Sequence, residues 1–282
     1  MIPFIISGLG VGAVYALSGV GLVVLYRASG VLNFAFGAIG ALAAYVAWSV
    51  LAHDGTPVLA WACAVGSAMA VSLAYGWLLA PRLAWRDRSV RSMGTLGLAL
   101  VVMGFTEWFW GEQPRRLLLP TDGLAFEFAE VRLPYSRVLA LTLAAAMVGG
   151  VGLLLARSRL GLQMRALAND RALSALLGVR VLQVDTVAWV LSGAFAGVCG
   201  LLLANMVRLQ ATYLTFLVIP AFAAAMLGRL HSLPLTALGG MAIGVVEAVA
   251  VMQPDVAPYR TAVPFVAALL AICFFRVSDR RA

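Results

Sequence analysis

The chain has 282 residues, of which 63% are hydrophobic and only 11% are charged, and its mean hydropathy is +0.98. Soluble domains carry about 25% charged residues, so this composition excludes an ordinary soluble protein and predicts an all-α, polytopic bundle of membrane helices. All 20 basic residues are arginine, and without a lysine the chain cannot hold the phosphate-binding loop of a Walker-type ATPase. The net charge of +8 does not indicate a nucleic-acid partner, because most arginines fall in short links between apolar spans.

Apolar stretches long enough to cross a bilayer follow one another along the chain, and we expect a single transmembrane domain over residues 1–282. We expect nine spans, with eight as the alternative, because the link at residues 26–34 is short enough to be a break within a re-entrant segment. The chain opens on an apolar stretch with no basic segment before it, so no cleavable signal peptide is expected. The expected spans are residues 4–25, 31–51, 58–80, 93–110, 138–156, 186–207, 213–228, 235–253 and 261–275.

Arginine is distributed unequally between the two sets of links. The arginine-rich links are residues 82–91, 157–180 and 276–281, which all fall on one side. Because positively charged links stay in the cytoplasm, the N-terminus is expected outside and the C-terminus in the cytoplasm. The only long outer loop, residues 112–137, either lies across the membrane surface or is a plain connection. Its apolar residues are Leu117, Leu118, Leu119, Phe126 and Phe128.

Cysteine and histidine do not form a metal-binding pattern. Cys63, Cys199 and Cys273 lie singly in apolar runs, whereas His53 and His231 lie in different loops. We therefore expect no disulfide, no metal centre and no cofactor on this chain. The sequence offers no nucleophile–base pair and no paired carboxylates at a usable spacing, so enzymatic chemistry is not expected.

Small residues recur at a spacing that lets helix backbones approach closely. In lipid such faces drive helix association, because hydrophobicity itself provides no force between helices. The pattern predicts tight packing within a multi-span bundle and names no substrate. The pairs are Gly8 and Gly12, Gly193 and Gly197, and Gly240 and Gly244.

Few polar or ionisable residues fall at membrane depth, and each ionisable one is a candidate for function. Glu107 lies near the outer end of its span, where its carboxylate could simply reach the interface. Glu247 lies deeper, so we expect it to face a cavity or to pair with a polar group. Asp185 opens its span, where an acid favours the positive end of a helix, so we expect it to cap that helix. Asn33 starts another span, and it either caps that helix or lines a break in it.

The expected cytoplasmic link at residues 157–183 contains a helix-like run, RALANDRALSALLGVR, at residues 165–180. Gly178 is placed where a helix ends. The run is either a surface helix on lipid headgroups or a docking helix for a soluble partner. Its apolar stripe consists of Ala166, Leu173, Leu176 and Leu177.

Three segments in this order resemble the permeases of branched-chain amino acid ABC importers. They are GLGVGAVYALSGVGLVVLYRASGVLNFAFGAIGALAAYV (8–46), RALANDRALSALLGV followed by GAFAGVCGLLL (193–203), and AMLGRLHSLPLTALGGMAIGVVEA (225–248). The resemblance covers nearly the whole length of the chain.

The resemblance implies roles for particular residues. Residues 165–179 match the family's coupling loop, whose short helix docks in a cleft of the ATPase subunit. The start of the second-span motif and a late glutamate also match, and we expect them to line the translocation path. The candidate coupling residues are Arg165, Ala168, Asn169, Asp170, Leu173, Leu176, Leu177 and Gly178. The candidate path residues are Asn33, Phe34, Gly37, Glu107 and Glu247.

Three features depart from the family's pattern. Phe36 stands where a histidine is common. The turn GRLHS (228–232) replaces a Gly-Gly-hydrophobic-Gly-Ser turn, so Arg229 and His231 stand where glycines are usual. The usual extension after the last span is cut to RVSDRRA. A bulkier turn could alter contact with partner subunits, and a divergent member could carry a different substrate.

The resemblance implies one membrane subunit of an ATP-driven importer of branched-chain amino acids in the bacterial inner membrane. The expected partners are a second permease, identical or homologous, two cytoplasmic ATPase subunits, and a periplasmic or lipid-anchored substrate-binding protein. An importer of urea or short amides is the alternative within this class. A proton-coupled carrier that uses Glu247 and a membrane scaffold without transport are the alternatives outside it.

Overall fold

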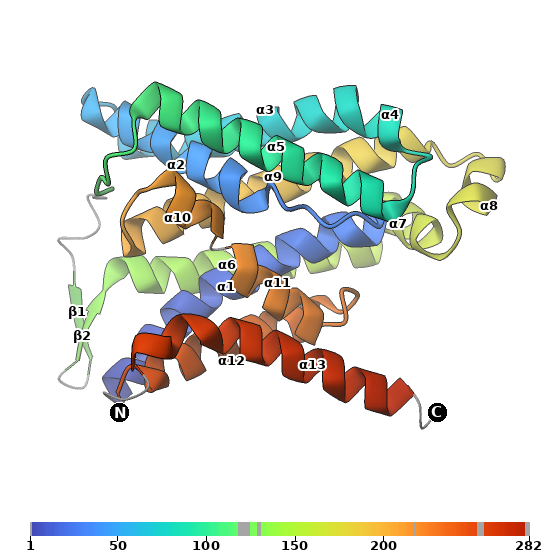
Figure 1. Cartoon of the computed structure of the whole chain (residues 1–282). Coiled ribbons are helices and arrows are strands. Elements are labelled where there is room, and N and C mark those ends of the chain that lie inside the picture. The colour runs from blue at the N-terminus through green and yellow to red at the C-terminus, as the bar shows by residue number, and fades with distance from the viewer. Residues whose placement is uncertain (1, 118–124, 129–130, 217, 253–256, 280–282) are drawn as a thin grey trace. The chain divides into compact units, whose positions relative to one another are not determined.

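The computed structural model describes residues 2–117, 125–128, 131–216, 218–252 and 257–279. Most of these residues lie in helices, and a short antiparallel hairpin pairs β1 (Ala125–Phe128) with β2 (Val131–Pro134) (Figure 1). The all-α, polytopic class predicted from composition is therefore confirmed. A π-helix, η1 (Tyr75–Leu79), connects α3 to α4. A 3-10 helix, η3 (Ala257–Ala262), leads into α13.

The helices have the following bounds: α1 (Ile2–Ser29), α2 (Phe36–Ala52), α3 (Pro57–Ala74), α4 (Ala80–Leu83), α5 (Arg88–Trp110), α6 (Tyr135–Arg157), α7 (Arg159–Asn169), α8 (Arg171–Leu176), α9 (Val181–Met206), α10 (Ala211–Phe216), α11 (Val218–Leu227), α12 (Leu233–Ala250) and α13 (Val263–Asp279).

Six stretches within the described residues are long and apolar enough to cross a membrane. Two further apolar helical stretches, Phe36–Ala52 and Ala211–Leu227, are shorter. Every predicted span overlaps a helix, whereas the predicted total of eight or nine spans stays a prediction. The six long stretches are Ile6–Ser29, Pro57–Leu83, Arg88–Trp110, Tyr135–Arg157, Val181–Met206 and Leu233–Ala250.

Contacts between Cα atoms divide the chain into two compact units. Unit 1 comprises Met1–Val23, Thr121–Val148 and Ile219–Ala282, and unit 2 comprises Val24–Pro120 and Gly149–Val218. The predicted single domain over the whole chain stays a prediction, and the two units are described separately below.

Unit 2 is built around α2, α3 and α9, which lie side by side (Figure 1). Glycines allow these helices to approach closely. A Cβ atom on Gly193 would lie 2.8 Å from the carbonyl oxygen of Ala68 in α3, and one on Gly197 would lie 3.0 Å from Val65 Cα. Farther along α9, Gly200 meets the backbone of α2 at Gly40. At these glycines the backbone of α9 therefore touches the backbone of α2 and the backbone and small side chains of α3.

In unit 1 the same kind of contact joins α1 to α12. A Cβ atom on Gly244 would lie 2.3 Å from Gly12 Cα, and one on Gly8 would lie 2.8 Å from the carbonyl oxygen of Gly244. Gly240 lies equally close to the backbone of Ala16. Beside this contact, Tyr15 packs with Ile243 and with small residues of α11 in a buried cluster. The helices α12 and α13 also contact each other.

The predicted outer loop is partly folded. Arg115 pairs through its backbone with Leu209, and Leu117 is buried. The hairpin of β1 and β2 precedes α6. Leu118 and Leu119, two of the apolar residues that favoured a location on the membrane surface, lie outside the described residues. That location stays a prediction.

Candidate functional site

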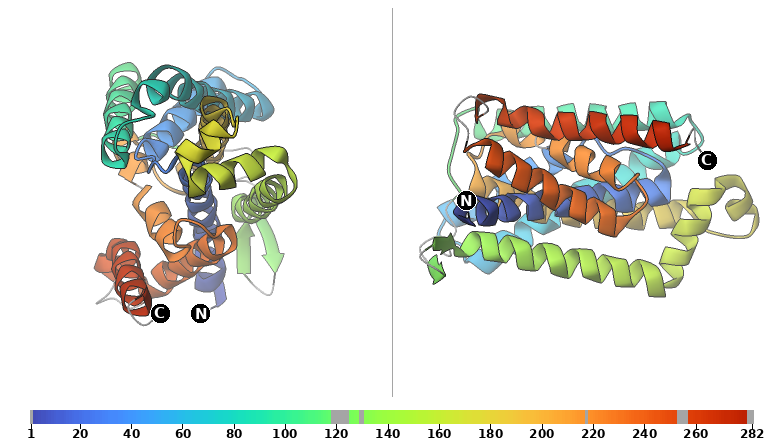
Figure 2. Two further views of the ribbon diagram at one scale, coloured as in Figure 1. Left: turned by 90° about the vertical axis from the view of Figure 1, so that its right-hand side faces the viewer. Right: turned by 90° about the horizontal axis from the view of Figure 1, so that it is seen from below.

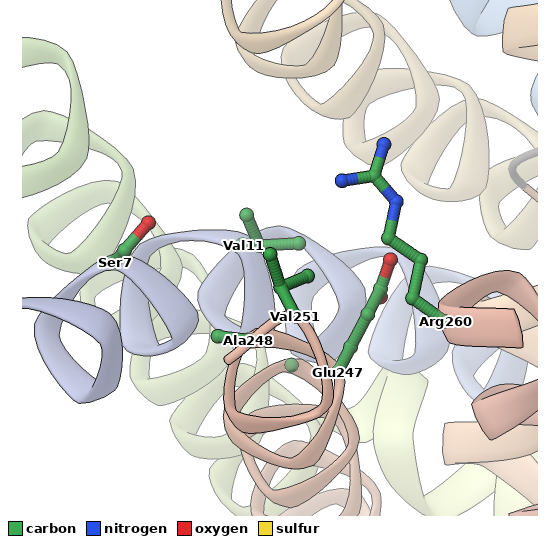
Figure 3. A pocket seen from close by; sticks show the side chains of 7 residues that line it. Ser7, Val11, Glu247, Ala248, Val251 and Arg260 are labelled. Carbon is green, nitrogen blue, oxygen red and sulfur yellow. The ribbon is translucent and has the colours of Figure 1, made fainter. Parts of the chain in front are cut away.

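A cavity of about 220 Å³ in unit 1 surrounds Glu247 (Figure 3). Glu247 reaches it from the last turn of α12, and Arg260 reaches it from η3. The remaining wall is mostly small and apolar. The cavity is lined by Ser7 and Val11 of α1, by Gly244, Glu247 and Ala248 of α12, and by Val251 and Arg260.

Glu247 is held by a hydrogen bond from the opposite helix. Tyr15 Oη donates to Glu247 Oε2 at 2.9 Å, and the Tyr15 side chain is buried in the contact between α1 and α12. The close approach of the glycines fixes the distance between these helices, so the phenol meets the carboxylate without a bridging group. Arg260 lies near enough for its charge to act on Glu247. The cavity can therefore offer a carboxylate and a guanidinium to one small molecule.

Asn33 lies in a non-helical link, residues 30–35, between α1 and α2. Hydroxyl groups of α5 satisfy the backbone of this link. Thr95 Oγ1 accepts a hydrogen bond from the Phe34 amide at 3.0 Å and donates to the Leu32 carbonyl at 2.9 Å. Ser92 Oγ accepts one from the Leu32 amide at 3.3 Å. Such pairing is what permits irregular backbone at membrane depth.

The Asn33 side chain is only 1% exposed, and its Oδ1 accepts a hydrogen bond from the Ala35 amide at 3.1 Å. Within the part of the chain that the structure describes, its Nδ2 has no hydrogen-bond partner. The residue therefore lies in the break rather than inside either helix. Phe36, which replaces the family's common histidine, is buried at the start of α2.

Two other candidate path residues contact α10 in unit 2. Glu107 Oε1 accepts a hydrogen bond from Thr212 Oγ1 at 2.5 Å. Gly37 faces Thr215 so closely that a Cβ atom there would overlap the Thr215 carbonyl group. Thus α10 contacts both the start of α2 and the end of α5. Glu247 belongs to unit 1, so the candidate path residues are divided between the two units.

The predicted coupling segment forms two helices, α7 and α8, where a single helical run was predicted. These helices lie at one end of unit 2, where the chain turns away from the axis of α6 (Figure 2). The break falls at Asp170, whose backbone is extended at φ −147°. Its Oδ1 accepts a hydrogen bond from the Leu173 amide at 2.9 Å. The expectation of one continuous helix was wrong because this carboxylate caps a new helix.

The candidate coupling residues cluster around this break. Ala168 and Asn169 end α7 and are exposed, as are Arg165 and Asp170. The leucines that follow are also exposed, with Leu176 at 85% and Leu177 at 77%. After them, Gly178 adopts φ +86°, a left-handed conformation that glycine tolerates best. Leu162 of α7 and Leu173 of α8 extend the exposed apolar surface.

Asp185 was predicted to cap a span, and this prediction was wrong. Helix α9 begins four residues earlier, at Val181, so Asp185 lies within the helix. Its carboxylate instead forms a two-pronged ion pair with Arg171, in which one prong joins Nη1 to Oδ1 at 3.3 Å and the other joins Nη2 to Oδ2. The pair is formed across the loop between α8 and α9.

Sequence reasoning missed the partners of the candidate carboxylates. Tyr15 and Arg260 at Glu247, Thr212 at Glu107, and Arg171 at Asp185 were not singled out for these roles. The glycine pairs on α1 and α12 offered one usable signal. They indicate that these two helices can approach closely, which places Tyr15 and Glu247 within reach of each other.

Comparison with known proteins identifies the family. A family model described as branched-chain amino acid transport system, permease component, matches residues 4–273. The high-affinity branched-chain amino acid transport system permease protein BraD of Pseudomonas aeruginosa is 28% identical over 86% of this chain and 84% of its own length. The permease protein LivH of Escherichia coli K12, of the same description, is 28% identical over 86% of this chain and 83% of its own length.

Among solved structures, PsaBC from Streptococcus pneumoniae in complex with Fab matches with 14% identity and a TM-score of 0.47, covering 96% of this chain and 89% of that one. The family assignment rests on the family model, which covers nearly the whole chain, and the relatives agree with it. The chain therefore belongs to the permease component family of branched-chain amino acid transport systems.

Proposed function

We propose that the chain is a membrane subunit of an ATP-driven importer for branched-chain amino acids in the bacterial inner membrane. Two permease chains would form the translocation path, and a periplasmic or lipid-anchored protein would deliver the substrate. Two ATPase subunits would bind at the cytoplasmic side. The family and the names of the relatives support this function, as does the lack of any lysine for a nucleotide-binding loop.

The observation that carries the proposal is the exposed apolar surface of α7 and α8. Leu162, Leu173, Leu176 and Leu177 are all more than half exposed, although arginines and the acidic cap surround them. A surface of this kind marks a site of interaction with a protein or with a membrane. We assign it to the ATPase subunit because the match to the family's coupling loop falls on these residues.

The cavity at Glu247 supports the choice of substrate. An amino acid is a zwitterion, so its ammonium group would suit Glu247 and its carboxylate would suit Arg260. Urea and short amides are uncharged, so they would form an ion pair with neither Glu247 nor Arg260. We therefore favour amino acids over the alternative substrates within the class.

The first test is co-purification of the tagged chain from native membranes in mild detergent, followed by an ATPase assay. We expect the wild-type chain to retain an ATPase subunit and a second permease. The double variant Leu176→Ser/Leu177→Ser should lose the ATPase subunit, because the contact is apolar. The control Leu176→Met/Leu177→Met keeps the apolar surface and should retain it.

The second test uses proteoliposomes and separates the alternatives. Uptake of labelled leucine should require ATP and the partner subunits, and it should persist when a protonophore collapses the proton gradient. Uptake by this chain alone, abolished by Glu247→Gln and by the protonophore, would instead establish a proton-coupled carrier. Competition by urea but not by leucine would assign the importer to urea. A chain that captures no ATPase subunit and transports nothing would be a scaffold.

A further inference from the structure

Asp185 is a buried carboxylate that pairs with one cation and lies near a second on another helix. The residue is only 2% exposed, and its side chain forms the two-pronged ion pair with Arg171, the first residue of α8. Arg91 of α5 is also buried, at 8% exposure, and lies near enough for its charge to act on both Asp185 and Arg171. The carboxylate in α9 thus pairs with a guanidinium from α8 and lies close to the charge of another from α5.

The same face of α9 also contacts η1, the segment that directly continues α3. Trp189 follows Asp185 by one helical turn and is buried. Its ring lies 4.5 Å from that of Tyr75, measured between centroids, and it also packs against Gly76. Tyr75 begins the π-helix η1, a type of helical irregularity that often occurs at functional sites. A movement of α9 at Asp185 would therefore reach α3 through a packed aromatic pair.

The covalent connection from α8 to α9 is poorly suited to transmit force. It consists of residues 177–180, and Gly178 lies in the left-handed region at φ +86°. Such a loop can absorb the displacement of a short helix by changing its dihedral angles. The ion pair bypasses this loop, because it ties the first residue of α8 directly to the second turn of α9.

We propose that Arg171 and Asp185 form a positioning link that carries the displacement of α8 to α9, and from α9 to α5 and α3. This inference rests on the proposed function, in which α7 and α8 receive the ATPase subunit. Neither residue touches substrate or nucleotide in this role. The link sets how much of the movement caused by ATP reaches the membrane helices.

The charge balance allows a clean test. Arg171→Met removes the ion pair of Asp185 but leaves the positive charge of Arg91 near its carboxylate. Arg171→Lys keeps the charge but loses the two-pronged geometry. The matched control is Arg180→Met, which removes an exposed arginine nearby that forms no ion pair in the described part of the chain.

Each variant is reconstituted with its ATPase subunits, and bound ATPase, ATP hydrolysis and leucine uptake are measured together. We expect Arg171→Met to retain the ATPase subunit and to hydrolyse ATP, while uptake per ATP falls about fivefold or more. Arg171→Lys should recover part of the ratio, and Arg180→Met should match the wild type. The comparison is made between variants that retain equal amounts of the ATPase subunit. Among these, a purely structural role of Arg171 in folding would not produce a partial recovery of uptake per ATP in Arg171→Lys.

Two results in the variants would overturn the link. Uptake per ATP at the wild-type value in Arg171→Met would show that the pair transmits nothing. Loss of the ATPase subunit from Arg171→Met would mean that Arg171 only shapes the docking surface. Failure of the proposed function would appear in the wild-type sample itself, as a complex without ATPase subunits, and it would remove the link as well. Failure of the link would thus be seen in the variants, and failure of the proposed function in the wild type.

Discussion

Gly200 provides the sharpest test of the packing in unit 2. A Cβ atom at this position would lie 2.0 Å from the carbonyl oxygen of Gly40 and 2.6 Å from Gly40 Cα. Ordinary van der Waals contact begins near 3.4 Å, so Gly200→Ala must separate α2 from α9 by about 1.4 Å. The obstacle is backbone, which cannot rotate away as a side chain would.

Two opposing effects determine the result of Gly200→Ala. Replacing glycine by alanine within a helix contributes about 1 kcal/mol in favour of folding. Overpacking costs up to about 3 kcal/mol when neighbouring backbone must shift. We therefore expect Gly200→Ala to lower the free energy of unfolding by about 2 kcal/mol.

The assay is equilibrium unfolding in detergent micelles, followed by circular dichroism. Gly66→Ala in α3 is the matched control, because a Cβ atom on exposed Gly66 would have no neighbour within 4 Å. This control should become more stable by about 1 kcal/mol at most. An equal rise in stability in both variants would refute the close contact between α2 and α9.

Three other substitutions test single contacts and backbone conformations by the same unfolding assay. Tyr15→Phe removes a hydrogen bond to a carboxylate, so it should cost about 1.5 kcal/mol in the wild type and clearly less in a Glu247→Leu background; equal losses would argue against the bond. Arg229 has φ +54°, and Arg229→Gly should raise stability by about 0.5–1 kcal/mol because relief of strain exceeds the added chain entropy. Arg229→Ala keeps the strain and should show no rise. Gly178 has φ +86°, so Gly178→Ala should lower stability by about 1 kcal/mol, and an unchanged value would show that the loop relaxes.

Hydropathy located the membrane helices because each apolar stretch must be long enough to cross the bilayer. It placed their ends less well. The predicted span at residues 186–207 began too late, since α9 starts at Val181 and the charge of Asp185 interrupts the apolar stretch there. The break between α7 and α8 was missed for a related reason. The residues on both sides of Asp170 fit one helical run in the sequence. Only the hydrogen bond from the Leu173 amide to the Asp170 carboxylate reveals that a new helix begins there.

The chemistry of the candidate sites depends on partners that lie far apart in the sequence. Tyr15 and Glu247 are separated by 232 positions, and Asp185 and Arg171 by 14 positions across a loop. No helical periodicity connects such residues, so a carboxylate can be recognised as unusual while its partner stays unknown. The deep position of Glu247 predicted a cavity or a polar partner, and the structure gives it both.

The π-helix η1 also constrains how the length of this chain can vary. A π-helical turn holds one residue more than an α-helical turn, and each residue of an α-helix advances the chain by about 100° around the axis. Deleting one residue from Tyr75–Leu79 would therefore turn the π-helical turn into an α-helical one and leave α4 close to its present rotation relative to α3, whereas a deletion within the regular part of α3 would rotate everything after it by about 100°. Related sequences can therefore lose one residue at η1 while the residues between it and Arg88, where α5 begins, keep the faces that they present here.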